Sequence, residues 1–330
     1  MVLLLDYMAW EGGFMTAQKT AGRVKRVFSR SVATVAFWLV ILYAIFLSRE
    51  AAGYVISGME LAVFRVVPTA FVSMLVCDIF RGVGGGGGLP LLGWIFSRAF
   101  GVSRSCIPAV IMGNICGFPT GAREVARAYE IGSITKEEAE RMLPIASNAS
   151  PAFIVGVVGG MMGDVGVGIR LLFCVTLSTV ICGVIIRKNN VVYHNSSVVV
   201  RQNCNMIESI KSAGASSLGV ISAICAFAVP LGFIEKHVDF LPLKCLFFTT
   251  MELAAGVDFL VNESGFSPVI LGGSMAFSLG FGGLCAMLQS RVISADHGIS
   301  FRWFLPIKML QGVVSALLFF GSFAIQNWVN

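Results

Sequence analysis

Uncharged polar residues gather at two places between Gly113 and Gly163 where apolar sequence is interrupted. The first interruption reads GFPTG at 117–121, and the second reads SNASP at 147–151. Proline suits the first turn of a helix, so each interruption predicts that one helix ends and another begins. Helix ends carry unpaired backbone groups and partial charges that can hold a polar solute, so the two interruptions form a candidate binding site.

The candidate substrate-binding residues are those at or near the helix breaks, because amide, hydroxyl and backbone groups there can hold a solute or cap a helix. They are Asn114, Pro119, Thr120, Gly121, Arg123, Glu124, Asn148, Ser150, Pro151, Gly282, Gly283 and Gln289. The alternative is that the polar members only cap helix ends and satisfy neighbouring helices. Arg123 and Arg127 are four residues apart, so they also fit a stripe that faces solvent or lipid headgroups.

Three other ionisable residues lie in or beside apolar segments, where such groups are expensive and often functional. If 241–260 lies along the membrane interface, Glu252 reaches water. Lys308 is predicted near the outer end of the last span, where its ammonium can snorkel to the surface. Asp78 precedes Arg81 and is expected as a charge at the inner end of the second span.

No recognisable catalytic or metal-binding motif occurs in the sequence. The three histidines lie far apart, and the nine cysteines are scattered through mostly apolar stretches without a CxxC or a Cys/His cluster. The five-glycine run at 84–88 lacks the Lys-Ser/Thr ending of a phosphate loop, and we interpret it as a flexible linker. We therefore expect that the protein is not an enzyme and uses no cofactor or metal.

The composition indicates a polytopic membrane protein. Of the 330 residues, 56% are hydrophobic and 13% charged, whereas charged residues make up about 25% of a soluble domain. Runs nearly free of charge at 32–48, 167–186 and 305–325 are long enough to span a membrane. The net charge of +6 includes a basic cluster before the first span, which predicts a cytoplasmic N-terminus and no nucleic-acid partner.

The predicted architecture is all-α, with two membrane halves. Residues 1–30 form a basic cytoplasmic tail, 31–186 the N-terminal half, 187–211 a polar cytoplasmic linker and 212–330 the C-terminal half. We expect extra spans in the N-terminal and linking regions.

In the N-terminal half, we expect a short outer segment at 49–60, a span at 61–80 and an interfacial helix at 89–100. The segment at 107–118 is too short to cross, which predicts a re-entrant hairpin with its tip at 117–121. A cytoplasmic surface helix at 136–141 and a span at 149–162 are expected next.

In the C-terminal half, 216–233 is predicted to span and 241–260 to lie along the interface. The segments 268–281 and 282–293 resemble a second hairpin, entered from outside. The last span, at 305–325, then returns.

Short sequence matches predict that the halves are inverted repeats of span, interfacial helix, broken hairpin and span. Gly117-Phe118 matches Gly280-Phe281, and the motifs LPL and MLP at 89–91 and 142–144 match LPL and FLP at 241–243 and 304–306. Inverted repeats that meet at broken helices near the midplane are typical of secondary transporters.

Three sequence blocks together resemble the sporulation integral membrane protein YlbJ family: GFPTGA at 117–122, GxITKEEAER at 132–141 and NASPxF at 148–153. FGGL at 281–284, with Gln289 and Lys308, adds a weaker match, and the resemblance covers roughly residues 60–325. It implies a protein of the nucleoside-recognition Gate domain group, similar to half of a concentrative nucleoside transporter core. Phe118, Thr120 and Ser150 depart from the family pattern, which leaves the ligand preference open.

Two hypotheses from different functional classes follow. The leading one is a multi-pass cell-membrane protein of endospore formation that acts as a secondary transporter or permease for a small polar, nucleoside-like solute. The alternative is a non-transporting scaffold needed for spore development, in which the small residues at 156–168 pack against partner helices. The expected partners are the solute and the lipid bilayer, and analogy with nucleoside carriers adds a homo-oligomer.

Overall fold

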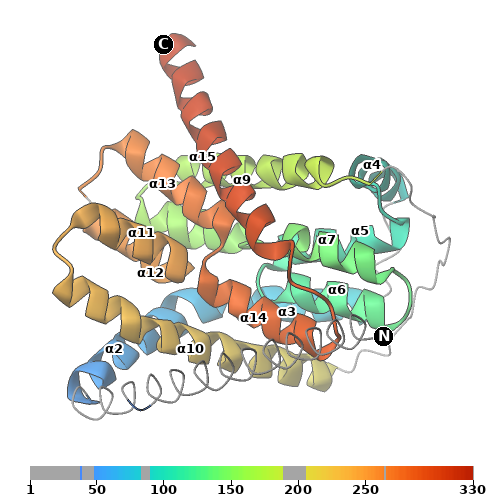
Figure 1. Cartoon of the computed structure of the whole chain (residues 1–330), viewed down its shortest axis with the longest axis horizontal. Coiled ribbons are helices and arrows are strands. Elements are labelled where there is room, and N and C mark those ends of the chain that lie inside the picture. Colours follow the sequence, from blue (N-terminus) through green and yellow to red (C-terminus); the bar gives the residue numbers. More distant parts are fainter. Residues whose placement is uncertain (1–37, 39–47, 83–89, 189–205, 264, 330) are drawn as a thin grey trace, which may run out of the picture. The chain divides into compact units, whose positions relative to one another are not determined.

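The computed structural model describes residues 38, 48–82, 90–188, 206–263 and 265–329, and all regular structure in these ranges is helical (Figure 1). This confirms the all-α prediction for the described part of the chain. The predicted tail at 1–30 and the glycine run at 84–88 lie outside the described residues, as do most of the predicted span at 32–48 and of the linker.

Five described helical stretches are long and apolar enough to cross a membrane. They are Arg49–Ile79, Val165–Ile185, Met206–His237, Pro268–Asp296 and Phe304–Ala324. A bent pair, Leu91–Phe100 with Arg104–Cys116, makes a sixth candidate if its two parts, which meet at 107°, count as one span. The chain is therefore a multi-pass membrane protein.

The first described helices form one continuous stretch: α2 (Ser48–Leu61), the π-helical turn η1 (Ala62–Val66) and α3 (Val67–Gly82). The sequence predicted a short outer segment at 49–60, separate from the next span. In the structure these residues are helical and continuous with that span. Pro68 cannot donate a backbone hydrogen bond, and the wider turn just before it accommodates that loss without ending the helix.

The chain reverses at the first interruption, as the sequence predicts. The helix α5 (Ile107–Cys116) ends at Gly117, whose φ is 78°, and α6 (Thr120–Glu130) folds back against α5. A Cβ on Gly121 would lie 1.9 Å from the carbonyl oxygen of Ala146. Only glycine therefore allows the hairpin to approach the end of the next helix this closely. The interfacial helix predicted at 89–100 corresponds to α4 (Pro90–Phe100).

The next helix, α7 (Lys136–Ala146), is the first part of a broken segment. It begins at a capping box formed by Thr135 and Glu138 and ends at Ala146. After the non-helical residues 147–150, the chain becomes helical again as the π-helical η4 (Ala152–Val158) and the short α8 (Gly159–Met161). The prediction of a surface helix at 136–141 is wrong from Glu138 onward, because residues 138–146 are all buried. The following helix α9 (Val165–Ile185) matches the predicted span.

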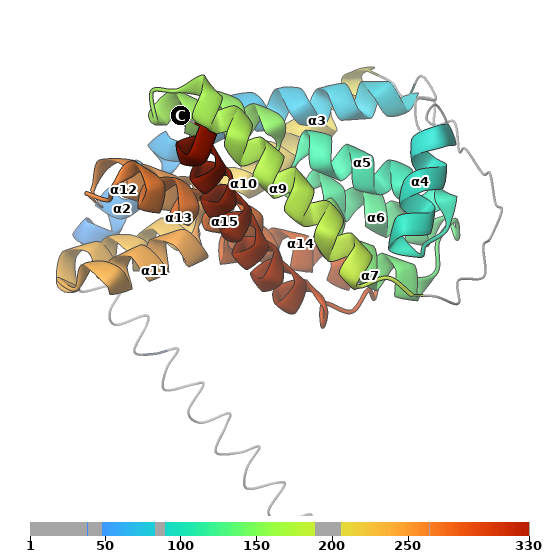
Figure 2. The ribbon, with the colours of Figure 1, turned by 90° about the horizontal axis from the view of Figure 1, so that it is seen from above.

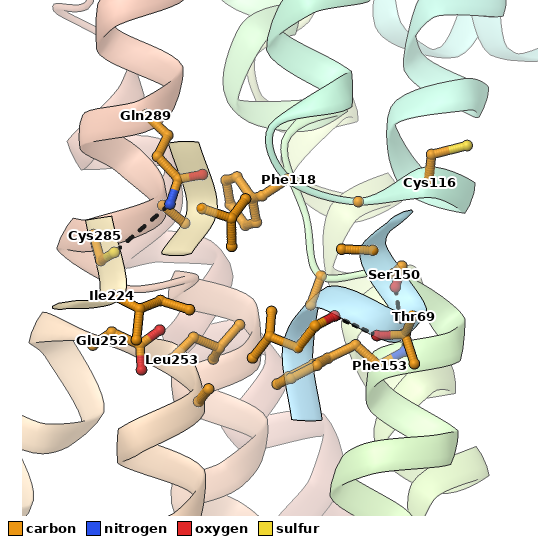
Figure 3. A pocket seen from close by; sticks show the side chains of 17 residues that line it. Thr69, Cys116, Phe118, Ser150, Phe153, Ile224, Glu252, Leu253, Cys285 and Gln289 are labelled. Atoms are coloured by element: carbon orange, nitrogen blue, oxygen red, sulfur yellow. Dashed lines mark hydrogen bonds between the residues drawn. The ribbon is translucent and has the colours of Figure 1, made fainter. Parts of the chain in front are cut away.

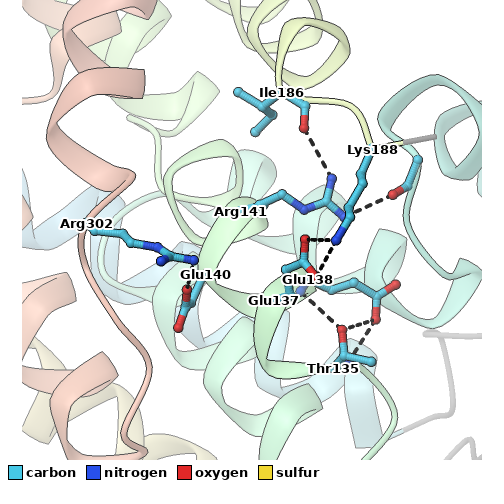
Figure 4. Close-up of polar contacts among 9 residues, drawn as sticks. Thr135, Glu137, Glu138, Glu140, Arg141, Ile186, Lys188 and Arg302 are labelled. Carbon is cyan, nitrogen blue, oxygen red and sulfur yellow. Dashed lines mark hydrogen bonds and ion pairs between the residues drawn. The ribbon is translucent and has the colours of Figure 1, made fainter. Parts of the chain in front are cut away.

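The charged start of α7 is compensated within the protein (Figure 4). Glu137 pairs with Lys188 at 2.7 Å, and Glu140 pairs with Arg302 at 3.2 Å. Arg141 donates to two backbone carbonyls of neighbouring segments. The hydrogen bond from Lys188 holds the pKa of the exposed Glu137 carboxyl below its usual range. These contacts bring the start of α7, the end of α9 and the loop before the last helix to one end of the protein, called here the charged end.

In the second half, the long helix α10 (Met206–His237) precedes two short helices, α11 (Leu241–Met251) and α12 (Leu253–Asn262). The sequence predicted one interfacial helix at 241–260. The structure instead breaks it at Glu252, whose carboxylate accepts a hydrogen bond from the N–H of Ala255 and so caps α12. The two short helices pack against each other, with the rings of Phe248 and Phe259 stacked 4.3 Å apart.

The helices α13 (Pro268–Phe281) and α14 (Leu284–Asp296) follow one another across Gly282 and Gly283, which have φ values of 88° and 77°. Together they form a single stretch able to cross a membrane. The structure therefore differs from the predicted second hairpin at 268–293, because the glycines interrupt the helix without reversing it. The last helix, α15 (Phe304–Val329), packs along α13 and crosses α9 (Figures 1 and 2).

Candidate functional site

A pocket lies where four interruptions of helical structure come together (Figure 3). Its lining includes 116–118 at the first hairpin tip and 252–254 where α11 gives way to α12. Ala149, Ser150 and Phe153 line it after α7, and Cys285, Ala286 and Gln289 line it at the start of α14. Residues of η1, α3 and α10 complete its wall. The empty volume is about 580 Å³, including space that opens to the surroundings. Helix breaks from both halves of the chain therefore surround one cavity.

The pocket is mostly apolar, with four side chains that offer hydrogen bonds or charge. Figure 3 shows Glu252 and Gln289 on one side and Thr69 and Ser150 on the other. The Ser150 hydroxyl accepts from the N–H of Phe153, and its own proton has no acceptor in the part of the chain that the structure describes, so it can be donated to a ligand. Within the described ranges, the Gln289 amide makes only a 3.7 Å hydrogen bond, to the sulfur of Cys285. A few polar groups in an apolar cavity are typical of small-molecule sites.

Two of the predicted ligand residues, Ser150 and Gln289, line this pocket. Gly282 and Gly283 lie at the break beside it: a Cβ on Gly282 would be 2.8 Å from the Phe118 ring, and one on Gly283 would be 3.1 Å from the backbone nitrogen of Leu253. Gly282 therefore lets the breaks of the two halves approach each other, and Gly283 lets the two breaks of the second half do so.

The other predicted ligand residues at 117–124 and 147–151 that are named next do not line the pocket. Pro119 and Pro151 stand just before α6 and η4, and Gly121 packs on the end of α7. Thr120 is fully buried, and its hydroxyl has no hydrogen-bond partner among the described residues. Glu124 is half-buried and is not part of the pocket lining.

Asn114 and Asn148, predicted as ligand contacts, hold the helix break together. The side-chain nitrogen of Asn148 donates to the side-chain oxygen of Asn114 at 2.7 Å and to the carbonyl of Ile145 at 2.9 Å. The side-chain nitrogen of Asn114 donates to the carbonyls of Val110 and Ile145. Both amides therefore form hydrogen bonds with backbone carbonyls at the helix break and with each other. This is the alternative stated above, in which the polar residues satisfy helix ends and neighbouring helices instead of a solute.

Lys308 lies at the centre of this polar cluster. Its side chain is fully buried, so the predicted snorkelling is wrong. The ammonium donates to the carbonyl of Ser147 at 3.0 Å and to the side-chain oxygens of Asn148 and Gln311, each at 2.8 Å. It also lies 5.6 Å from the centroid of the Phe118 ring. The start of α15 packs against α7, which keeps this side chain away from any surface.

Sequence reasoning missed Gln311 and Thr179, which complete the cluster. The Gln311 nitrogen donates to the side-chain oxygen of Asn148 at 2.7 Å and to the hydroxyl of Thr179 at 2.8 Å. A lysine followed three residues later by glutamine inside an apolar span was the available signal, because both groups then share one helix face.

Two of the sequence blocks that resemble a known family, 117–122 and 148–153, contribute residues to this pocket and cluster. The chain is similar to a sporulation protein of Bacillus subtilis. That relative, the sporulation integral membrane protein YlbJ of strain 168, is 22% identical over 250 residues. The match covers 62% of this chain and 61% of the relative's length. It confirms the resemblance predicted from the motifs.

Two further comparisons found no match. No family model matches the chain. No solved structure matches it.

Arg123 faces away from the pocket, toward α3 and α10. Its guanidinium donates to the hydroxyls of Ser212 and Ser216 at 2.9 and 3.2 Å and lies 3.6 Å from the carboxylate of Asp78. Asp78 is buried, which corrects the prediction of a charge at the membrane surface. The pair joins the first hairpin to the helices behind it instead of facing solvent or headgroups.

Proposed function

We propose that this protein is a secondary transporter or permease that binds a small, nucleoside-like solute with a few polar groups in the pocket between the helix breaks. The observation that carries the proposal is the meeting of four interruptions, two from each half, at one cavity. Broken helices at membrane depth are tolerated where they line a cavity, and secondary transporters place their substrate sites there. The similarity to a sporulation membrane protein favours a role in endospore formation.

We also propose that the two halves are inverted repeats, in a register different from the one the sequence matches indicated. In the proposed register, hairpin α5–α6 corresponds to hairpin α11–α12. The broken segment α7–η4 corresponds to the broken segment α13–α14, and the span α9 corresponds to the span α15. In this register, each hairpin tip touches the break of the segment after it. A Cβ on Gly117 would lie 2.8 Å from the backbone nitrogen of Ser150, and Gly283 faces Leu253 in the same way.

The packing of the remaining helices supports this register. The equivalent spans α9 and α15 pack on each other, and α7 contacts α15 as α13 contacts α9. The hydroxyls of Ser178 on α9 and Ser315 on α15 are 2.7 Å apart, near the middle of both helices, where a two-fold axis would pass. Hairpin α5–α6 starts at the charged end, whereas hairpin α11–α12 leads into the start of α13, which packs beside Phe319 in the second half of α15.

The charged end is proposed to face the cytoplasm. It carries Arg141, Lys188 and Arg302, and an excess of basic residues marks the cytoplasmic side of membrane proteins. A cytoplasmic N-terminus follows from the basic cluster before the first span.

The test is the accessibility of a single cysteine, Ser150→Cys, in a variant without the native cysteines. We expect a membrane-impermeant thiol reagent to label it from at least one side of the membrane, and the transported solute to slow that labelling. Ser178→Cys is the matched control, because Ser178 is also a buried serine, lies at the α9–α15 contact away from the pocket, and should not react.

A Ser150→Cys variant sealed from both sides would overturn the transporter proposal and favour the scaffold. The solute is sought by a thermal-shift screen of nucleosides, bases and other small polar compounds, followed by uptake into proteoliposomes. A ligand that stabilises the wild type but not Gln289→Ala places its site in this pocket by binding linkage.

A further inference from the structure

We propose that the Lys308 ammonium fills a built-in site for a monovalent cation, so that the protein supplies from its own chain the cation that would otherwise have to bind between the helix breaks. The consequence for transport, that solute binding needs neither Na⁺ nor K⁺, rests on the proposed function. The occupancy of the site does not, and it can be tested without any solute.

The coordination of Lys308 carries the inference. An ammonium has three N–H donors, and here each meets one oxygen at 2.8 to 3.0 Å. All three acceptors are neutral: one backbone carbonyl and two side-chain amides. No carboxylate pairs with Lys308 in the described part of the chain. Buried charges are usually paired with opposite charge, so a cage of neutral oxygens around an ammonium is unusual.

The same groups are the ones that hold free monovalent cations in transporters. Ser147 stands at the C-terminal end of α7, where the helix dipole places partial negative charge and the carbonyls are unpaired. Unwound carbonyls and half-helix C-terminal ends coordinate Na⁺ in secondary transporters. The face of the Phe118 ring adds an attraction for a cation on the side toward the pocket.

The position of the ammonium connects it to the pocket wall. Phe118 lines the pocket, and a Cβ on Gly282 would meet both the Phe118 ring at 2.8 Å and the Lys308 side chain at 3.5 Å. The cation therefore holds the tip of the first hairpin against the break of the second half. Without a cation at this place, the oxygens of Ser147, Asn148 and Gln311 would each lose the donor from which they accept, and the Phe118 ring would lose its cation contact.

The experiment compares thermal unfolding of the wild type and Lys308→Ala, purified without added solute, in chloride salts of choline, Na⁺, K⁺ and ammonium at equal ionic strength. The wild type is expected to have the same Tm in all four salts. Lys308→Ala is expected to melt lower in choline and to recover by about 3 °C or more, saturably, with at least one of the small cations. Arg65→Ala, which removes an exposed ion pair elsewhere, should show no dependence on cation identity.

A folded Lys308→Ala with the same Tm in all four salts would overturn the proposal, because the lysine would then act only as a tether between helices. If Lys308→Ala does not fold in choline, Lys308→Met keeps the apolar stem, and monodisperse protein should be recovered from membranes solubilised with a small cation. Failure of both variants in every salt also counts against the proposal. The cysteine-accessibility test at Ser150 is independent of these outcomes, so a failure of the cation site and a failure of the transporter proposal can be told apart.

Discussion

The polar residues of the helix breaks divide into two groups that face different ways. Ser150 and Gln289 face the cavity with unused hydrogen-bonding capacity, whereas Asn114, Asn148, Gln311 and Lys308 bond to one another. Buried networks of this kind are stable only when every member is satisfied. The first group is therefore available to a ligand, and the second fixes the breaks that shape the cavity.

Glycine at position 121 is predicted to be essential for the first hairpin. A methyl group there would meet the carbonyl of Ala146, so Gly121→Ala should destabilise the protein by about 1–3 kcal/mol through overpacking. Thermal or denaturant unfolding in detergent measures the change.

The control is Gly160→Ala, since nothing lies within 4 Å of a Cβ at that exposed helical position. It should be neutral or stabilising, because alanine favours helices over glycine. Equal stability of Gly121→Ala and the wild type would contradict the close approach of α6 and α7.

The identity of some residues was readable from the sequence, but their role was not. The GFPTG and SNASP runs predict chain breaks because glycine and proline act locally. Whether Asn148 faces a solute or Lys308 depends on a helix about 160 residues later in the chain. No local pattern contains that contact.

At the scale of elements, α7 shows how a charged sequence can be buried. Its first turn is held by the capping box, in which Thr135 accepts from the N–H of Glu138 and Glu138 accepts from the N–H of Thr135. The second carboxylate oxygen of Glu138 also accepts from the N–H of Ser103, before α5. Glu138 therefore ties the start of α7 to the start of the hairpin.

Removal of the two capping side chains should have unequal effects. Thr135→Ala is expected to cost about 1 kcal/mol of unfolding free energy, as loss of an N-cap does. Glu138→Ala should cost about twice as much, because it also leaves the buried N–H of Ser103 without a charged acceptor. Unfolding in detergent compares the two variants, and a smaller effect for Glu138→Ala would show that the Ser103 contact contributes nothing.

The hairpins show the limit of sequence reasoning about elements. The reversal at 117–121 was predicted because 107–118 is too short to span. The break at Glu252 was missed because 241–260 contains no proline or glycine at the break, and the residue there caps the second helix with its own side chain. The break at the glycine pair 282–283 was predicted, but as the tip of a hairpin. Local sequence does not tell whether the chain reverses at a helix break or continues in the same direction, as it does here.

At the scale of the whole molecule, the contact between α9 and α15 is central to the proposed repeat. The helices cross where the hydroxyls of Ser178 and Ser315 meet, 137 residues apart in the chain. This crossing and the four breaks come from both halves, so the cavity exists only when the halves are assembled.

A disulfide between α9 and α15 tests this assembly. In a variant without native cysteines, Ser178→Cys with Ser315→Cys should cross-link in native membranes under mild oxidation, because the hydroxyls they replace are 2.7 Å apart. Mass spectrometry of the linked peptides measures the yield. The control pair, Ser178→Cys with Ser322→Cys, places the second thiol about two turns further along α15 and should not cross-link. Equal yields for both pairs would contradict the packing of the two spans.

The sequence by itself determined that this is a helical membrane protein with breaks at GFPTG and SNASP, because span length, charge and the effects of glycine and proline are local properties. Only the tertiary structure decided that the breaks surround one cavity and that Lys308 is buried. Those outcomes depend on helices more than 100 residues apart that pack closely through small residues and satisfy each other's polar groups. Such pairings have no signature within any one segment.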